Sequence, residues 1–215
     1  MSDQIKHHLT DALLMAYSAG TLPEAFNLVI ATHVSMCDAC RAAVESYDAV
    51  GGALLAETET VVVSPEALAS TLALIRAAEN TPPVAPPPPA DVPRPLADYI
   101  GGSLSQVAWR SVGMGVKQAV LDTSDEATAR LLFIPAGAAM PDHGHNGIEM
   151  TLVLRGAFFD EDARFGPGDI EVATEVDQHT PVADIGEDCI CLAVTDAPLK
   201  FRGWLPRLAQ PFLGI

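Results

Sequence analysis

The sequence has little positive charge. Its 215 residues include 12 lysines and arginines against 28 aspartates and glutamates, a formal net charge of −16. The first 80 residues hold 3 basic and 10 acidic side chains and the remainder 9 and 18, so both halves are acidic. Such surfaces repel the phosphates of nucleic acids, which argues against direct binding to DNA or RNA. A protein partner with a basic surface would be attracted instead, although the acidic charge taken alone favours a simple role in solubility.

Long hydrophobic runs and a secretory signal are also missing. No apolar stretch approaches the roughly 18 residues that a membrane-spanning helix needs. The first residues, MSDQIKHHLTDALL, lack a basic region, an apolar core and a small-residue cleavage site. We therefore expect a cytoplasmic protein without membrane contact. Cysteine is scarce, with 4 residues, and in a reducing compartment metal binding or redox chemistry is expected of them rather than structural disulfides.

A proline-rich stretch divides the chain. Residues 81–95, TPPVAPPPPADVPRP, contain eight prolines, which remove too many N–H donors for a helix or a sheet to continue through them. We expect an extended spacer of the polyproline type rather than a recognition site for a proline-binding module. The apolar fraction of 49% lets each flanking half bury a core. The sequence thus predicts domains at 1–80 and 96–215, joined by a linker at 81–95.

The pattern before the linker is helical. Residues 11–17 predict a short helix that stops at Gly20. Thr21-Leu-Pro-Glu24 has the order of an N-cap, a first-turn proline and a capping-box acid, so a second helix is expected from there to about residue 36. Two more helices are expected: one at about 38–55, with Asp38 as N-cap and an interruption near Gly51-Gly52, and one from 64–67 to about residue 80.

The pattern after the linker indicates short strands. Four runs are rich in β-branched and apolar residues and are bounded by Gly, Pro or Asp: 129–134, 150–154, 170–173 and 189–194. Several short strands at close spacing suggest a sandwich or a barrel. The predicted fold class is therefore α + β in two domains, with an all-α N-terminal domain and an all-β C-terminal domain.

One group of possible metal ligands lies in the helical half. His33 and Cys37 are four positions apart and share a helix face, and Cys40 joins them if the chain turns. Imidazole and thiolate donors suit tetrahedral Zn²⁺. A closed site needs a fourth ligand, and the spacing does not decide between His7 and His8. The alternatives are buried free cysteines beside a surface histidine, or a redox pair.

The His-x-x-x-Cys-x-x-Cys motif with an upstream histidine resembles the zinc-binding anti-sigma domain of bacterial regulators. From Ile5 to Ile215 the chain is similar to the ChrR group of that family, including Ala53-Leu54, residues 95–98 and Pro211-Phe212. The resemblance implies His8 as the fourth ligand and a structural zinc. It also implies a 1:1 complex with an extracytoplasmic-function (group IV) sigma factor, which is kept from core RNA polymerase.

A second group of possible ligands has a different spacing. His143 and His145 are two residues apart, so on a strand they point to the same face, and Glu149 follows a short turn. His179, after a turn at 166–169, can close the site from a neighbouring strand. Three imidazoles and one carboxylate suit Zn²⁺, Fe²⁺, Mn²⁺ or Ni²⁺, and the residue types do not separate these metals.

The spacing Gly-x5-His-x-His-x3-Glu-x6-Gly, from Gly137 to Gly156, resembles the first motif of the cupin barrel without departure. The Pro-Gly-Asp turn and His179 resemble the second motif, but His179 lies farther downstream and no asparagine stands four residues beyond it. The resemblance to ChrR proteins implies that the cupin is needed to release the sigma factor under oxidative stress such as singlet oxygen. We expect a second divalent metal in this cupin, with zinc favoured. Oxidation or loss of a ligand would alter how the cupin contacts the helical domain, and proteolysis could follow.

Two other functions stay open for the second domain: a cupin dioxygenase with Fe²⁺ at the same four residues, or a sensor that binds a small ligand. The cysteine and histidine cluster in a separate domain favours a regulator without catalytic residues, since a cupin enzyme has no need of it. Cys189 and Cys191 point the same way on a strand and are too close for a relaxed disulfide. For these two we favour core packing over oxidation sensing.

Overall fold

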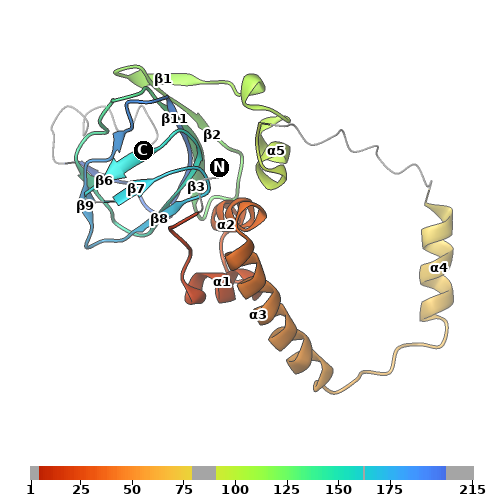
Figure 1. The fold of residues 1–215 in the computed structure, drawn as a ribbon. Coiled ribbons are helices and arrows are strands. Elements are labelled where there is room, and N and C mark those ends of the chain that lie inside the picture. Colours follow the sequence, from red (N-terminus) through yellow and green to blue (C-terminus); the bar gives the residue numbers. More distant parts are fainter. Residues whose placement is uncertain (1–4, 79–90, 162, 202–215) are drawn as a thin grey trace.

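The computed structural model describes residues 5–78, 91–161 and 163–201. A helical N-terminal half packs against a β-rich C-terminal half, as the change in hydrophobic period predicts (Figure 1). Most of the predicted linker (81–90), the expected end of the fourth helix near residue 80 and the Pro211-Phe212 pair lie outside the described residues. In the part of the chain that is described, no helix is both long and apolar enough to cross a membrane.

Four helices match the predicted segments before the linker, with differences at their ends and in their course: α1 (Asp11–Ser18), α2 (Glu24–Met36), α3 (Asp38–Ala56) and α4 (Ala67–Ala77). Helix α5 (Arg94–Ile100) and the 3-10 turn η1 (Leu104–Gln106) were not predicted. Thr21 does not cap α2, because its hydroxyl donates to the Ala16 carbonyl (3.1 Å), and Pro23 takes the N-cap position. The interruption predicted at Gly51-Gly52 is wrong: α3 runs through both glycines, whose cost of about 1 kcal/mol each does not break the hydrogen-bond ladder.

Helix α5 begins inside the segment predicted as linker. Pro95 is accommodated because the first turn of a helix needs no N–H donor there. The helix ends at Gly101, which has a left-handed φ of 76° that favours glycine. Although α5 lies on the C-terminal side of the linker, it packs against α2 of the N-terminal half.

The β-rich half contains one six-stranded sheet, in the order β1-β2-β3-β11-β5-β8, and two three-stranded sheets, β10-β6-β7 and β12-β4-β9. The four predicted strands are β3 (Thr128–Ile134), β5 (Glu149–Arg155), β8 (Ile170–Ala173) and β11 (Cys189–Thr195). The others, which the sequence did not predict, are β1 (Arg110–Gly113), β2 (Val116–Val120), β4 (His143–Gly144), β6 (Phe158–Asp160), β7 (Ala163–Phe165), β9 (Gln178–His179), β10 (Val182–Ala183) and β12 (Lys200–Phe201). The strands thus form three sheets rather than one closed ring.

Alternate residues of the central strands face two different cores. Leu131, Leu152 and Leu192 are register partners on β3, β5 and β11, and they join the apolar core of the helices. Val153 and Cys191, one position along, face the interior of the β-rich half. One side of the sheet therefore binds helices and the other side encloses a separate interior.

Helix α2 connects the two halves. It lies between the sheet and helices α1 and α3 (Figure 1), and it packs against β3, β5 and β11 as well as α5. Phe26, Val29 and Ile30 of this helix are buried in a core shared by residues of both halves. The two halves are thus continuous through one apolar core, and a shift of the sheet would be transmitted to α2.

Candidate metal centres

Four side chains of the helical half converge. The Nδ1 atom of His8 lies 3.3 Å from the Cys37 sulfur and 3.7 Å from the Cys40 sulfur, and Nε2 of His33 lies 3.2 Å from the Cys40 sulfur. Around a tetrahedral Zn²⁺ with ordinary bond lengths, nitrogen and sulfur ligands are separated by about 3.6 Å. The donor set and its spacing therefore fit zinc.

The cluster forms because the chain breaks between two helices at Cys37. This residue ends α2, with its N–H bonded to the His33 carbonyl (2.9 Å), and it also serves as the N-cap of α3. Its sulfur accepts from the Cys40 N–H at 3.5 Å. The predicted N-cap, Asp38, is instead the first residue of α3. One residue thus ends a helix, starts the next and contributes a sulfur to the cluster.

The structure shows which of the two N-terminal histidines, His7 or His8, faces the cluster. His8 points into the cluster, as the family resemblance implies. His7 turns away, and its ring lies 4.2 Å from that of Phe165 in the β-rich half. Because neighbouring residues of an extended segment point to opposite sides, one histidine reaches the helices and the other reaches the sheet.

Burial makes this cluster suitable for a cation. His33 is completely buried, which lowers its pKa and favours the neutral imidazole that binds metals. Burial also raises the pKa of the Cys40 thiol to about 11. A thiolate at this position therefore needs a cation beside it, and Zn²⁺ binding would supply that charge.

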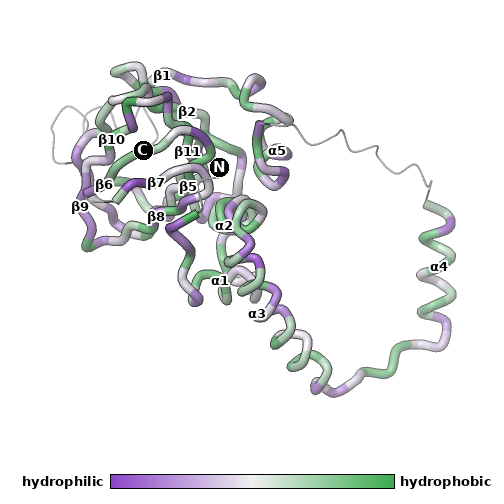
Figure 2. The backbone as a smooth tube through the Cα atoms, viewed as in Figure 1, coloured by the Kyte–Doolittle hydropathy of each residue, from purple (hydrophilic) through white to green (hydrophobic). Residues whose placement is uncertain are grey.

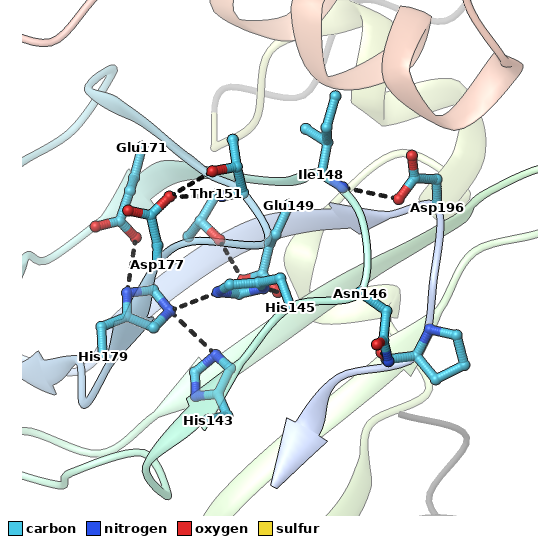
Figure 3. A network of polar contacts seen from close by, with 12 residues as sticks. His143, His145, Asn146, Ile148, Glu149, Thr151, Glu171, Asp177, His179 and Asp196 are labelled. Atoms are coloured by element: carbon cyan, nitrogen blue, oxygen red, sulfur yellow. Dashed lines mark hydrogen bonds and ion pairs between the residues drawn. The ribbon is translucent and has the colours of Figure 1, made fainter.

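Three histidines form the second cluster, shown in Figure 3. The Nε2 atom of His179 lies 3.1 Å from Nε2 of His145 and 3.2 Å from Nε2 of His143. Nitrogen ligands of tetrahedral zinc are separated by about 3.3 Å. Glu149 lies beside this group, with its Oε2 atom 3.5 Å from Nδ1 of His145. The structure thus brings together the three predicted histidines. Glu149 lies next to them, on the Nδ1 side of the His145 ring and not at the Nε2 atom that faces the other two histidines.

Hydrogen bonds aim two of these rings at a common point. The Nδ1–H of His143 donates to the Pro141 carbonyl (2.8 Å), and that of His179 donates to the Asp160 carboxylate (2.8 Å). Both Nε2 lone pairs are then directed to the centre of the cluster. Burial lowers the pKa of His143 and His145, so protons are disfavoured there. A metal ion is the cation that fits this arrangement.

Two carboxylates around His179 were not predicted from the sequence. Asp160 on β6 orients the ring, and Glu171 on β8 has an oxygen 4.0 Å from its Nδ1 atom. Burial and the neighbouring Asp160 raise the pKa of Glu171 to about 9, which favours the protonated form of this side chain. Neither residue has a motif or a spacing that would identify it, because the contacts arise only when separate sheets meet.

Cys189 and Cys191 lie in the interior of the β-rich half. Both side chains are fully buried, and their sulfur atoms are 3.4 Å apart. The Cys189 thiol, together with burial, raises the pKa of Cys191 well above its ordinary value. Buried thiols with raised pKa values react slowly, which agrees with the packing role favoured from the sequence.

The two halves are hydrogen-bonded to each other directly beside the first cluster. His33, whose Nε2 faces Cys40, donates its Nδ1–H to the carbonyl of Gly168 (2.9 Å). The Asp169 carboxylate accepts from the backbone N–H groups of Lys6 (2.6 Å) and His7 (2.9 Å). We call this set of contacts the junction. It joins the turn 166–169 to the N-terminal residues 5–8 and to His33.

Gly168 is required at the junction for two reasons. Its φ of 88° is in the left-handed region, and a Cβ atom there would lie 2.5 Å from the Cδ1 atom of Ile5. The turn leads directly into β8, which carries Glu171 beside His179. The junction is therefore separated from the second cluster by only a few residues of one strand.

Comparison with known proteins gives consistent matches over both halves. A family model described as the ChrR cupin-like domain matches residues 99–198. The anti-sigma-E factor ChrR of Cereibacter sphaeroides is 58% identical over 213 residues, covering 98% of this chain and 99% of the relative. Among solved structures, the complex of Rhodobacter sphaeroides SigE with the anti-sigma ChrR matches with a TM-score of 0.78 and 56% identity, covering 89% of this chain and 99% of that chain.

Proposed function

Since this chain belongs to the ChrR family of anti-sigma factors, regulators rather than enzymes, we propose that its helical half binds an extracytoplasmic-function sigma factor. A 1:1 complex would keep the sigma factor from core RNA polymerase, in the cytoplasm where transcription takes place. The relative in the solved complex is bound to SigE, and its alignment spans nearly its whole length. The acidic chain itself would not contact DNA.

The observation that carries the proposal is the apolar surface of α4. None of its residues is buried. Three of its large apolar side chains, Leu68, Leu74 and Ile75, are each more than half exposed. Helix α4 stands apart from the other helices in Figure 1, and hydrophobic residues recur along it in Figure 2. A helix with unpaired apolar side chains is stabilised by packing against a partner. The three valines at 61–63, in the segment between α3 and α4, are exposed as well.

We assign a structural zinc to His8, His33, Cys37 and Cys40. This ion would connect the N-terminal segment to the break between α2 and α3, and its binding free energy would contribute to folding. For the cupin we assign a second metal, with zinc favoured, to His143, His145, Glu149 and His179. The domain division proposed remains 1–80 for sigma binding, 81–95 for the linker and 96–215 for the cupin.

The cupin would control release through the junction. Oxidative stress, such as singlet oxygen, would remove or oxidise a ligand of the cupin metal. The strand β8 carries Glu171 next to His179 and follows directly on Asp169, which holds the N-terminal segment. A structural change at the cupin metal would therefore be transmitted through β8 to the segment that carries His8 and to the helix that carries His33. The sigma-binding helices would change their arrangement, and the sigma factor would be released.

The test uses the full chain co-expressed with an extracytoplasmic-function sigma factor from the same genome. Purification on a tag of the sigma factor should recover an equimolar complex, and Cys37→Ala/Cys40→Ala should abolish it together with one metal per chain. His143→Ala/His145→Ala should retain the complex but fail to release the sigma factor under a photosensitiser that generates singlet oxygen. A well-folded, metal-loaded chain that binds none of the candidate sigma factors would overturn the anti-sigma proposal. Normal release from the cupin variant would overturn the sensing role alone.

A further inference from the structure

The cupin encloses a cavity of about 410 Å³ next to its histidine cluster. The walls are inward-facing residues of β2, β3, β5, β8 and β11, and most of them are aliphatic, such as Val116, Leu132 and Ile134. His143 and Glu149 form part of the same wall. The volume lies within the range of pockets that hold small organic molecules. The cavity therefore places an apolar space directly beside the candidate metal.

One strongly basic group lines this apolar space. Arg130 of β3 is only 6% exposed, and its Nε atom has no hydrogen-bond partner. Its Nη1 atom donates one long hydrogen bond, 3.4 Å, to the Gln118 side chain. Among the described residues no carboxylate oxygen lies within 4.0 Å of the guanidinium. A buried cation is costly unless an anion pairs with it. Glu149 on the same cavity wall acts on Arg130 electrostatically but lies beyond ion-pair distance, so the guanidinium has no direct anionic partner.

The strand register shows where that charge would sit. Arg130 pairs with Ala193 on β11, and Ala193 pairs with Thr151 on β5. All three residues line the cavity. Adjacent strands are about 4.8 Å apart, so Arg130 and Thr151 are separated by about 10 Å across the small methyl group of Ala193. A head group of a few atoms fits over Ala193, between the guanidinium and the wall that holds Glu149.

We propose that the cupin cavity binds a small amphiphilic carboxylate, with its head group paired to Arg130 and its apolar body against the aliphatic walls. A planar guanidinium offers two parallel N–H donors that match the two oxygens of a carboxylate. One guanidinium balances one negative charge, which favours a monoanion over a phosphate dianion. The proposal concerns the cavity alone and does not depend on sigma-factor binding.

Access to the cavity is provided by the hairpin of β1 and β2. Its tip, Gly113-Met114-Gly115, contributes Gly113 and Met114 to the lining, and Met114 is 82% exposed. A flexible thioether at the rim adapts to different apolar ligands. A ligand that enters here would approach Arg130 and the candidate metal from the same side of the sheet.

The experiment measures binding of octanoate, and of octan-1-ol as its uncharged counterpart, to the full metal-loaded chain by calorimetry and ligand-observed NMR. Octanoate should bind saturably and more tightly than octan-1-ol. Arg130→Met should weaken octanoate binding about tenfold or more and leave octan-1-ol within about twofold, since only the charged head group loses its partner. Arg155→Gln, which removes an exposed arginine from the end of β5, is the matched control and should change neither. Metal content is measured for every variant, so that a lost metal is not mistaken for a lost anion site.

The thermal midpoint separates binding from folding. Removing a buried, poorly paired cation should leave the midpoint of Arg130→Met unchanged or raise it. If that variant does not fold, Ala193→Leu tests the same site by filling the cavity, and it should exclude both probes. The proposal is overturned if octanoate does not bind the wild-type chain, if octan-1-ol binds as tightly, or if a folded Arg130→Met binds octanoate as the wild type does.

Discussion

Single residues at the junction serve both halves of the molecule. His33 directs one ring nitrogen to the cysteines and the other to the Gly168 carbonyl, so its orientation is fixed from two sides. Asp169 binds the backbone of the segment that ends in His8. Outer hydrogen bonds of this kind orient metal ligands and affect the affinity of the site. The helical metal cluster therefore depends on residues that belong to the cupin.

Replacing Gly168 should weaken the junction. Gly168→Ala places a side chain at a φ of 88° and against Ile5, so we expect the free energy of unfolding to fall by about 1–3 kcal/mol. Displacement of residues 5–8 should also accelerate zinc release to a chromogenic chelator. The control is Gly186→Ala, where a Cβ atom meets nothing within 4 Å. Equal stability of the two variants in urea would contradict the role given to Gly168.

The four cysteines should react in two separate pairs. In the metal-loaded chain all four are buried and none should react quickly with a disulfide reagent such as DTNB. A chelator should expose Cys37 and Cys40, because their cluster is held by the metal. Cys189 and Cys191 should react only after unfolding by urea, since the thiolate is the reactive form and the pKa of Cys191 is raised. Rapid reaction of folded Cys37→Ser/Cys40→Ser would contradict this order.

The candidate ligands could be found from the sequence because each set has its own spacing. His33 and Cys37 are one helical turn apart, with Cys40 three residues further on beyond a turn, and His143 with His145 follows the period of a strand. The choice between His7 and His8 could not be made from spacing, because the segment is extended and its direction is set by Asp169, far away in the chain. Asp160, Glu171 and the Gly168 carbonyl were missed for the same reason.

Among the secondary-structure elements, α4 and β8 have the clearest functional roles. Helix α4 has no buried residue and is the helix proposed to contact the sigma factor, whereas β8 connects the junction to the surroundings of His179. Strands of seven residues such as β3, β5 and β11 were predicted because their hydrophobic runs are long. Strands of two residues, such as β4 and β9, carry no detectable period and form only by pairing across the fold.

Charges on α4 should abolish sigma binding without unfolding the chain. Leu68 and Ile75 are seven positions apart and lie on one helix face, so Leu68→Asp/Ile75→Asp should weaken the complex by at least about 30-fold. Both side chains are exposed, and the thermal midpoint of the free chain should therefore hardly change. Ile185→Asp, at an exposed apolar residue of the cupin, is the control and should retain normal affinity. Unchanged affinity of the α4 variant would exclude this helix from the interface.

For the molecule as a whole, the net charge of −16 acts together with the shared apolar core. The charge extends over both halves and would attract a basic partner over long range, while the core joins the halves into one packed body. The α + β division was predictable because the hydrophobic period changes at the linker. The packing of α2 on β3, β5 and β11 was not, since an apolar helix face does not specify its neighbour.

Salt should slow the association of the complex more than its dissociation. Raising sodium chloride from about 50 mM to about 500 mM shortens the Debye length severalfold and should reduce the association rate constant by about tenfold. The dissociation rate constant should change much less, because it depends on buried apolar contacts. Stopped-flow or surface plasmon resonance measurements check both values. Salt-independent association would show that the acidic charge has no part in recognising the sigma factor.

The junction also sets an order of events during synthesis. The hydrogen bond from Lys6 to Asp169 joins residues 163 positions apart, so this contact of the junction cannot form until nearly the whole protein has been translated. At about 5–20 residues per second, this interval is on the order of ten seconds. The helices proposed to bind the sigma factor leave the ribosome well before the cupin that would restrain or release them. Because His33 and the segment that carries His8 are both held by the turn at 166–169, a newly made chain would complete its helical metal cluster only when the cupin has been synthesised.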